Sequence, residues 1–340
     1  MNPFADRLAR GGAVLAPMAG YTDGPFRRLC REHGSAWAVT EMVSAKALAR
    51  GDERTLRLAA PYRGEPDLVI QLFAADPDEA AAAAALLADR FDPLAFDLNM
   101  GCPVRKVANK GCGVELMGRP DLARRIVQAV RGATGRAVSV KMRLGRDMLE
   151  VDDAADAAVE GGAALVSVHG RTGAQRYEGR ADWTPIAALA ARLPVPVVGS
   201  GDVEDARGAE ARRAQGPFVM VGRGALGRPW LFAELRGAAA PTWPEAAAVL
   251  LRHVRLQAAW YGEARGIRAL RGHLARYVAP WPEAAGLRPA LVRAERAGDV
   301  ARILAPSLPG GIVAGPPEGR PERASMTRSP ARAGAGGPLV

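Results

Sequence analysis

Short apolar runs alternate with longer helix-forming segments along the first two thirds of the chain. Eight of the runs have the length and composition of buried strands, at residues 13–16, 36–40, 68–73, 94–98, 137–142, 165–169, 195–199 and 218–221. Helices are expected between them, at 25–33, 44–58, 77–88, 120–132, 151–160, 183–192 and 203–214. Eight strand–helix units predict an α/β fold of the (β/α)₈ TIM-barrel type, which typically needs ~250 residues.

A doubly wound open sheet is the alternative fold for such an alternating pattern. That fold would carry a glycine-rich phosphate loop directly after an early strand. Here the early pair Gly11 and Gly12 precedes the first apolar run instead of following it. The pattern therefore favours the barrel.

The strand pattern ends near residue 240, which divides the chain. Helices are expected at 244–262, 264–279 and 289–304, so the sequence predicts a barrel domain over 1–240 and a small all-α domain over 241–310. In the remaining segment, 311–340, 11 of 30 residues are Gly or Pro. That composition predicts a disordered tail.

Positive charge is concentrated in the last hundred residues. The whole chain has 46 Lys+Arg and 36 Asp+Glu, a formal net charge of +10, and residues 241–340 hold 14 Arg against 7 acidic residues. On a helix over 264–279, four arginines would share a sector of about 140°: Arg265, Arg268, Arg271 and Arg276. Such a stripe can be an ordinary solvated face, but the charge imbalance favours a polyanionic partner.

The sequence lacks the features of membrane proteins, secreted proteins and zinc proteins. No run reaches the ~18–20 apolar residues of a membrane span, and the N-terminus lacks the apolar core of a signal peptide. The three cysteines, Cys30, Cys102 and Cys112, are too few for a disulfide framework or a zinc site. We therefore expect a cytoplasmic protein without a metal site, and the sequence gives no sign of an obligate protein partner.

A phosphate site is expected where the last two predicted strands end. Reactive groups of barrels lie at the carboxyl ends of the strands, and strands seven and eight commonly hold phosphate. Gly201 and Gly222 allow close backbone approach there, and Arg223 can add a charge-assisted contact. These residues predict a phosphate-bearing cofactor.

Other strand ends supply groups for the ring of such a cofactor. Gln71, Lys141 and His169 each lie at or near the end of a predicted strand. Lys141 would place a positive charge beside a flavin that becomes anionic on reduction. Pyridoxal phosphate bound to Lys141 as a Schiff base is the alternative, but it leaves Gln71 without a role. Each residue alone could equally be structural, so the prediction rests on their falling at one rim.

Cys102 is the strongest candidate for chemistry. It lies in a glycine-rich, charged loop, and two of the three asparagines, Asn99 and Asn109, lie within seven residues of it. An ordinary thiol has a pKa of ~8.5 and is protonated at neutral pH, whereas a nucleophile would need a partner base. The pattern favours a proton donor at Cys102, with Cys112 and Cys30 structural.

Five ordered segments resemble the tRNA-dihydrouridine synthases. They are residues 16–23 (APMAGYTD), 97–103 (DLNMGCP), 168–172 (VHGRT), 199–202 (GSGD) and 221–225 (VGRGA). The resemblance runs from about residue 11 to about 280, and Tyr261, Arg271 and His273 resemble the helical-domain signature of the bacterial B-type branch.

The resemblance implies an FMN-dependent enzyme that reduces the C5=C6 bond of specific uridines in tRNA and uses NADPH to reload the flavin. Hydride would pass from flavin N5 to C6, and Cys102 would protonate C5. Asn99 and Arg171 would address the uridine, while Arg268 and Arg271 of the helical domain would bind tRNA. The implied FMN site comprises Pro17, Met18, Gln71, Lys141, His169, Ser200, Gly201, Asp202, Gly222 and Arg223.

Three positions depart from the family pattern. Ser200 stands where many members have Asn, Ala74 where Gly often occurs, and Gly272 where Lys is usual. A dihydroorotate-dehydrogenase-like flavoprotein is an alternative, although it gives no use for a basic helical domain. A tRNA-binding protein without chemistry is another, against which the intact Cys102 loop argues.

Overall fold

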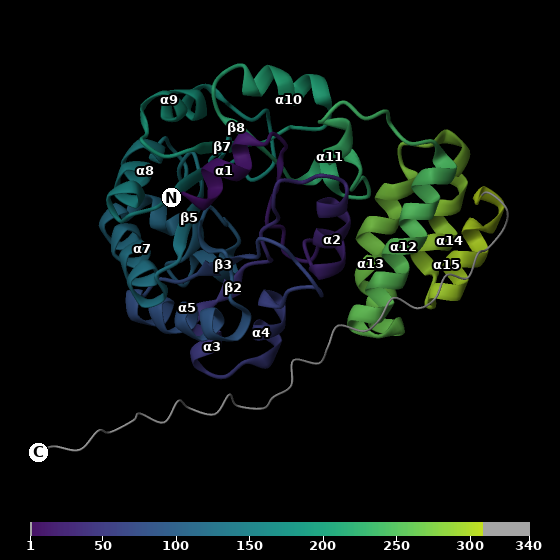
Figure 1. Ribbon diagram of the computed structural model, residues 1–340, viewed down its shortest axis with the longest axis horizontal. Helices are drawn as coiled ribbons and strands as arrows, with labels where there is room; N and C mark the ends of the chain where they lie inside the picture. Colours follow the sequence, from purple (N-terminus) through teal and green to yellow (C-terminus); the bar gives the residue numbers. More distant parts are fainter. Residues whose placement is uncertain (1, 309–340) are drawn as a thin grey trace, which may run out of the picture.

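The computed structural model describes residues 2–308, and it confirms the barrel. Eight parallel strands form one sheet in the order β1-β8-β7-β6-β5-β4-β3-β2, with helices around it (Figure 1). The strands are β1 Val14–Leu15, β2 Val43–Ser44, β3 Val69–Phe73, β4 Ala95–Met100, β5 Ala137–Arg143, β6 Leu165–His169, β7 Val197–Ser200 and β8 Phe218–Val221.

The predicted strand at 36–40 is the one that differs. It makes only isolated parallel bridges, Leu15 with Ala38 and Val39 with Val69, and these bridges close the barrel between β1 and β3. Regular pairing with β3 starts later, at β2. The ladder is interrupted because the backbone N–H of Gln71 donates to the Thr40 hydroxyl oxygen (3.0 Å) rather than to a carbonyl.

The outer helices follow the predicted alternation, with one segment divided. They are α2 Gly24–Glu32, α3 Ala45–Ala49, α4 Glu53–Ala59, α5 Pro77–Phe91, α6 Arg105–Ala108, α7 Pro120–Thr134, α8 Val151–Glu160, α9 Thr184–Arg192, α10 Ala206–Arg213 and α11 Leu231–Glu234. The segment predicted as one helix over 44–58 forms α3 and α4. Gly51 adopts φ +75°, and Asp52 then caps the N-terminus of α4.

A short N-terminal helix closes the bottom of the barrel. In α1, Pro3–Ala9, the Asn2 side chain caps the helix. Phe4 and Leu8 are buried in a cluster with residues from the amino ends of the strands, including Val69 and Val198. The carboxyl ends at the opposite side are therefore the open end.

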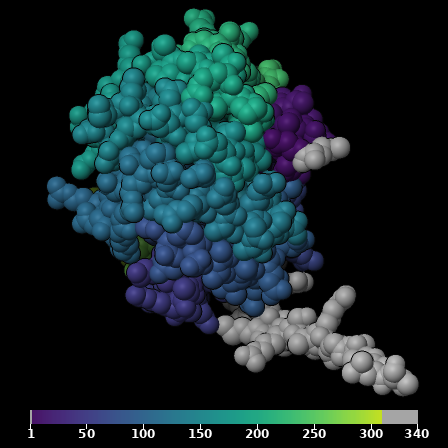
Figure 2. Space-filling view, turned by 90° about the vertical axis from the view of Figure 1, so that its left-hand side faces the viewer, coloured from purple at the N-terminus to yellow at the C-terminus, as the bar shows by residue number. Residues whose placement is uncertain are grey.

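The C-terminal region is helical. It comprises α12 Trp243–Tyr261, α13 Glu263–Val278, α14 Arg288–Arg293 and α15 Ala297–Leu304, which lie beside the barrel in Figure 1. The segment predicted as one helix over 289–304 forms α14 and α15, since Ala294 is extended at ψ +140° and Asp299 accepts from the Arg296 N–H. Turned by 90°, so that the left-hand side of the Figure 1 view faces the reader, the barrel presents a continuous surface (Figure 2). The predicted disordered tail lies outside the described residues.

The helical region packs on the barrel through α2. Phe26 of α2 contacts His253 of α12 and His273 of α13, with ring centroids 5.7 and 4.4 Å apart. The Gln257 amide donates to the Asp23 carboxylate (2.8 Å), and both are buried. The contact of α2 with α12 and α13 holds the C-terminal end of α13 near the open mouth of the barrel.

Candidate functional site

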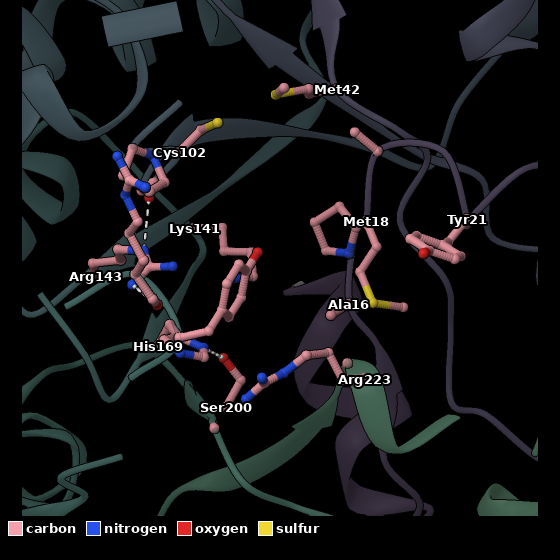
Figure 3. Close-up of a pocket in the computed structure, with 18 of the residues that line it drawn as sticks. Ala16, Met18, Tyr21, Met42, Cys102, Lys141, Arg143, His169, Ser200 and Arg223 are labelled. Atoms are coloured by element: carbon pink, nitrogen blue, oxygen red, sulfur yellow. Dashed lines mark hydrogen bonds between the residues drawn. The ribbon is translucent and has the colours of Figure 1, made fainter. Parts of the chain in front are cut away.

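A cavity of about 830 Å³ opens at the carboxyl ends of the strands, a volume within the usual range of ligand sites. Figure 3 shows side chains from several strands converging on it. Cys102 and Asn99 line it. So do all the residues predicted for the cofactor: Pro17, Met18, Gln71, Lys141, His169, Ser200, Gly201, Asp202, Gly222 and Arg223.

The loop after β4 holds Cys102 at the cavity wall. The backbone N–H groups of Gly101 and Cys102 donate to the Asn99 side-chain oxygen at 3.2 and 3.0 Å. Gly113 packs beneath, where a Cβ would lie 2.6 Å from the Cys102 carbonyl oxygen. Cys112 is buried and Cys102 is partly exposed, so only the Cys102 thiol of the two is accessible from the cavity.

Lys141 carries an unpaired ammonium group. It lies on β5 opposite Asn99 of β4 and lines the cavity. Its pKa is lowered to about 8, mainly by burial and in addition by Arg143, while Asp97 and Cys102 counteract the shift. Among residues 2–308 no hydrogen bond or ion pair engages this ammonium. An anionic or hydrogen-bond-accepting ligand would supply the missing partner.

His169 is neutral and held in one tautomer. Burial lowers its pKa far below the ordinary value, and Lys141, Arg143 and Arg171 add to the shift. The Nε2 atom lies 3.4 Å from an Arg171 guanidinium nitrogen, which can only donate, and Nδ1 lies 3.3 Å from the Ser200 hydroxyl. Nε2 is therefore the acceptor, and Nδ1 carries the proton.

Arg171 does not line the cavity, in contrast to its expected position beside the uridine. Its side chain is only 2% exposed, and it donates to the Glu178 and Gly179 carbonyls. It also donates to both Asp202 carboxylate oxygens at 2.8 and 2.7 Å. Although burial alone would raise the pKa of Asp202, this bond holds it below the ordinary value. Arg171 thus braces the β6 and β7 loops from below.

The other end of the cavity has the predicted features of an anion site. Gly222 faces the interior, where a Cβ would lie 3.7 Å from the Met18 sulfur. Arg223 is exposed at the rim, where its guanidinium makes one long ion pair, with Asp202 at 3.4 Å, and lies over the Tyr177 ring at 4.8 Å. Its guanidinium therefore remains available to a ligand.

Several lining residues were not predicted as site residues, and two of them, Arg143 and Tyr177, lie together. Arg143 donates to the Gly101 carbonyl (3.0 Å) and to the Thr172 and Arg176 carbonyls, which ties the Cys102 loop to the loop after β6. Tyr177 is 59% exposed, and its ring lies under the guanidinium groups of Arg143 and Arg223, at 5.6 and 4.8 Å. Arg143 ends a strand, so its position could have signalled the site.

Another lining residue that was not predicted for the site, Arg276, comes from the helical region. It lines the cavity and lies over the Tyr21 ring at 5.5 Å. Arg268 and Arg271, predicted for tRNA binding, belong to the same helix, α13, but do not line the cavity. Arg268 is exposed and Arg271 is half-buried.

The rim is more basic than the net charge of the barrel indicates. Five arginines from separate segments line the cavity: Arg105, Arg143, Arg176, Arg223 and Arg276. Of the acidic residues in the described range 2–308, two line it with them, Asp202 and Glu204. The distribution of charge along the sequence therefore underestimates the local positive charge at the mouth of the barrel.

Residues 2–308 contain no group of three or more His, Cys, Asp or Glu side chains placed to hold a metal ion. Within the same range, no helix combines the length and the apolar character that crossing a bilayer requires.

Comparison with known proteins gives a family. Residues 14–305 match the family model described as dihydrouridine synthase. A probable tRNA-dihydrouridine synthase of Rhizobium leguminosarum bv. phaseoli is 40% identical over 295 residues, 85% of this chain and 90% of that protein. One of Mycobacterium tuberculosis is 42% identical over 300 residues, 82% and 77% of the two chains. The tRNA-dihydrouridine synthase B of Xanthomonas campestris pv. campestris is 38% identical over 295 residues, 83% and 88%. The chain therefore belongs to the dihydrouridine synthase family.

Proposed function

We propose that this protein reduces the C5=C6 bond of specific uridines in tRNA, with FMN as the cofactor and NADPH as the reductant. Membership of the dihydrouridine synthase family makes the chain an oxidoreductase. One observation carries the finer assignment: the partly exposed Cys102 thiol shares a cavity with the unpaired Lys141 ammonium and an arginine-bearing anion site.

The residues present fit FMN. Its phosphate would be held by the Gly201 and Gly222 loops and by Arg223, and Pro17 and Met18 would form a wall. Lys141 would meet the ring and relieve the cost of its unpaired charge, while Gln71 and His169 complete the polar side. FMN, when bound, supplies the hydride that C6 of the uridine receives.

Cys102 supplies the proton for C5. A protonated thiol at the cavity wall can act as a general acid without a partner base. The Asn99 amide nitrogen donates to the Gln71 oxygen (2.9 Å) and makes a long contact with the Met42 sulfur (3.9 Å), so its second N–H would exchange the sulfur for a carbonyl oxygen of the uracil. The basic rim and α13 would bind the RNA backbone.

The alternative flavoprotein reading fits the mouth of the cavity less well. A dihydroorotate-dehydrogenase-like enzyme takes a small free substrate and gives no use for Arg276, which reaches the mouth from the helical region. Turnover of free dihydroorotate by the purified protein would support that alternative.

Two cysteine variants test the proposal. Cys102→Ala should retain flavin and NADPH oxidation while dihydrouridine formation falls by ~10²- to 10⁴-fold, the usual contribution of general acid catalysis. Dihydrouridine in unmodified tRNA is the measurement. Cys112→Ala is the matched control, since Cys112 does not line the cavity. Equal activity in both variants would overturn the assignment of Cys102.

A further inference from the structure

A continuous chain of buried side-chain hydrogen bonds runs through the barrel interior to the Cys102 loop. The Ser139 hydroxyl donates to one Asp97 carboxylate oxygen (2.6 Å), and the Gln71 amide nitrogen donates to the other (2.7 Å). The Asn99 amide nitrogen then donates to the Gln71 oxygen (2.9 Å). The Asn99 oxygen finally accepts from the Gly101 and Cys102 backbone N–H groups.

This hydrogen-bond chain has a direction that its two ends set together, because the Gly101 and Cys102 N–H groups can only donate and a carboxylate at Asp97 can only accept. A carboxylate accepts hydrogen bonds and cannot donate them, so Asp97 obliges Gln71 to turn its nitrogen inward and its oxygen toward Asn99. Asn99 must then turn its nitrogen toward Gln71 and its oxygen toward the loop. The oxygen and nitrogen of an amide have nearly the same shape, so without this carboxylate nothing at the inner end would orient Gln71, and only the two loop N–H groups would orient Asn99.

Asp97 is remote from the reacting groups. It is 3% exposed and does not line the cavity, whereas Gln71, Asn99 and Cys102 do. Its registered neighbours on β3 and β5 are Gln71 and Ser139, so the strand pairing itself places the three together. A buried carboxylate is costly unless it is hydrogen-bonded. The role of a buried carboxylate at this position would be to orient the two amides.

We infer that Asp97 is a positioning residue that, through Gln71 and Asn99, fixes the Cys102 loop for proton transfer. Reversal of the two amides would point the Asn99 nitrogen at two backbone N–H groups, and the loop would have to move. A displacement of about 1 Å at a reacting group can cost about 10²-fold in rate. This inference rests on the proposed role of Cys102.

The first test is the isosteric variant Asp97→Asn. An amide at 97 can still accept from the Ser139 hydroxyl while it donates to the Gln71 oxygen. That arrangement reverses the direction of the hydrogen bonds from residue 97 to Asn99. With enzyme whose flavin is reduced beforehand, a single turnover on unmodified tRNA measures the transfer step alone. We expect its rate to fall by about 10- to 100-fold, with tRNA affinity unchanged. Ser139→Ala, which removes a donor but reverses nothing, is the control and should lose far less.

The decisive variant is Asp97→Asn combined with Gln71→Glu. It moves the carboxylate one position along the hydrogen-bond chain, from residue 97 to residue 71. The amide at 97 then donates to the carboxylate at 71, which again accepts from Asn99. Recovery of most of the lost transfer rate supports the inference, and so does folding of the double variant where the single variant fails to fold. Absence of recovery, or an unchanged rate in Asp97→Asn, overturns it. Loss of dihydrouridine formation in Cys102→Ala reports separately on the proposed function.

Discussion

At the residue scale, the site gathers positive charge around a neutral imidazole, that of His169, and an unpaired ammonium group, that of Lys141. Lys141, Arg143, Arg171 and Arg223 all act on the pKa of His169, and together with burial they keep its imidazole neutral. Lys141 itself is the least compensated of these cations, because it has no ion-pair partner in the described part of the chain. Its protonation should therefore be coupled measurably to stability.

That coupling predicts a pH-dependent stability in the flavin-free protein. The Lys141 pKa is about 8 in the folded protein, against an ordinary 10.5. Between these values the unfolded chain binds a proton that the folded chain lacks, so the free energy of unfolding rises with pH. Lys141→Met should be more stable than the wild type at pH 7, and the gap should close toward pH 10. Denaturant unfolding across this range measures it, and a constant gap would contradict the assignment.

Individual site residues were predictable where a polar residue ends an apolar strand. Lys141 and His169 follow that rule, and the structure brings both to the cavity. Arg171 obeys the same rule yet lies beneath the rim, because its long side chain turns back to Asp202. Side-chain direction after a strand depends on which partner is in reach, and the sequence does not display that partner.

At the element scale, the contact between α2, α12 and α13 contains two fully buried histidines. His253 Nδ1 lies 3.2 Å from the Tyr277 hydroxyl, and the two imidazoles have centroids 4.9 Å apart. Burial lowers the pKa of His273 to about 3, although a bond to the Tyr21 backbone opposes the shift and Arg276 adds to it. Burial also holds the pKa of His253 well below its ordinary value.

This contact predicts acid sensitivity of the helical region. Below pH 6.5 the unfolded chain protonates both histidines, whereas the folded chain cannot until far lower pH, so stability is lost as pH falls. The melting temperature should therefore drop between pH 7.5 and pH 5. His253→Gln with His273→Gln should be less stable at pH 7.5 but should lose less on acidification. Parallel pH profiles for the two proteins would refute this explanation.

Element boundaries show where sequence patterns stop being informative. The segments 44–58 and 289–304 each have continuous helical composition, yet a left-handed Gly51 and an extended Ala294 divide them. The stretch 36–40 is apolar like a strand, but the Thr40 hydroxyl takes the ladder hydrogen bond. Such breaks come from single backbone angles and side-chain bonds, which periodicity averages out.

At the scale of the whole molecule, the order of strands and helices was predictable and the distribution of charge was not. Alternating patterns specify the barrel because each strand must be buried on both faces. The arginines at the cavity mouth, in contrast, come from the end of β5, from the segments that follow β4, β6 and β8, and from α13. Only the closed barrel and the docked helical region bring them together, so RNA binding should be shared between the rim and α13.

Charge reversal on α13 tests that shared surface. Arg268→Glu with Arg271→Glu should weaken tRNA binding and reduce the slope of log affinity against log salt, which measures the number of neutralised phosphates. Some salt dependence of the affinity should remain, because the arginines that line the cavity are unchanged in this variant. Flavin content should be unchanged, since neither residue lines the cavity. Binding titrations at several salt concentrations provide the measurement.

The matched control places the same charge change on another helix. Arg288→Glu with Arg293→Glu alters α14, whose arginines are exposed and which lies on the outer side of the helical region in Figure 1. A general electrostatic attraction would respond equally to both pairs, because at long range only net charge matters. A specific surface along α13, leading to Arg276 at the mouth, would respond to the first pair much more. Equal effects would therefore show that α13 has no privileged contact with the RNA.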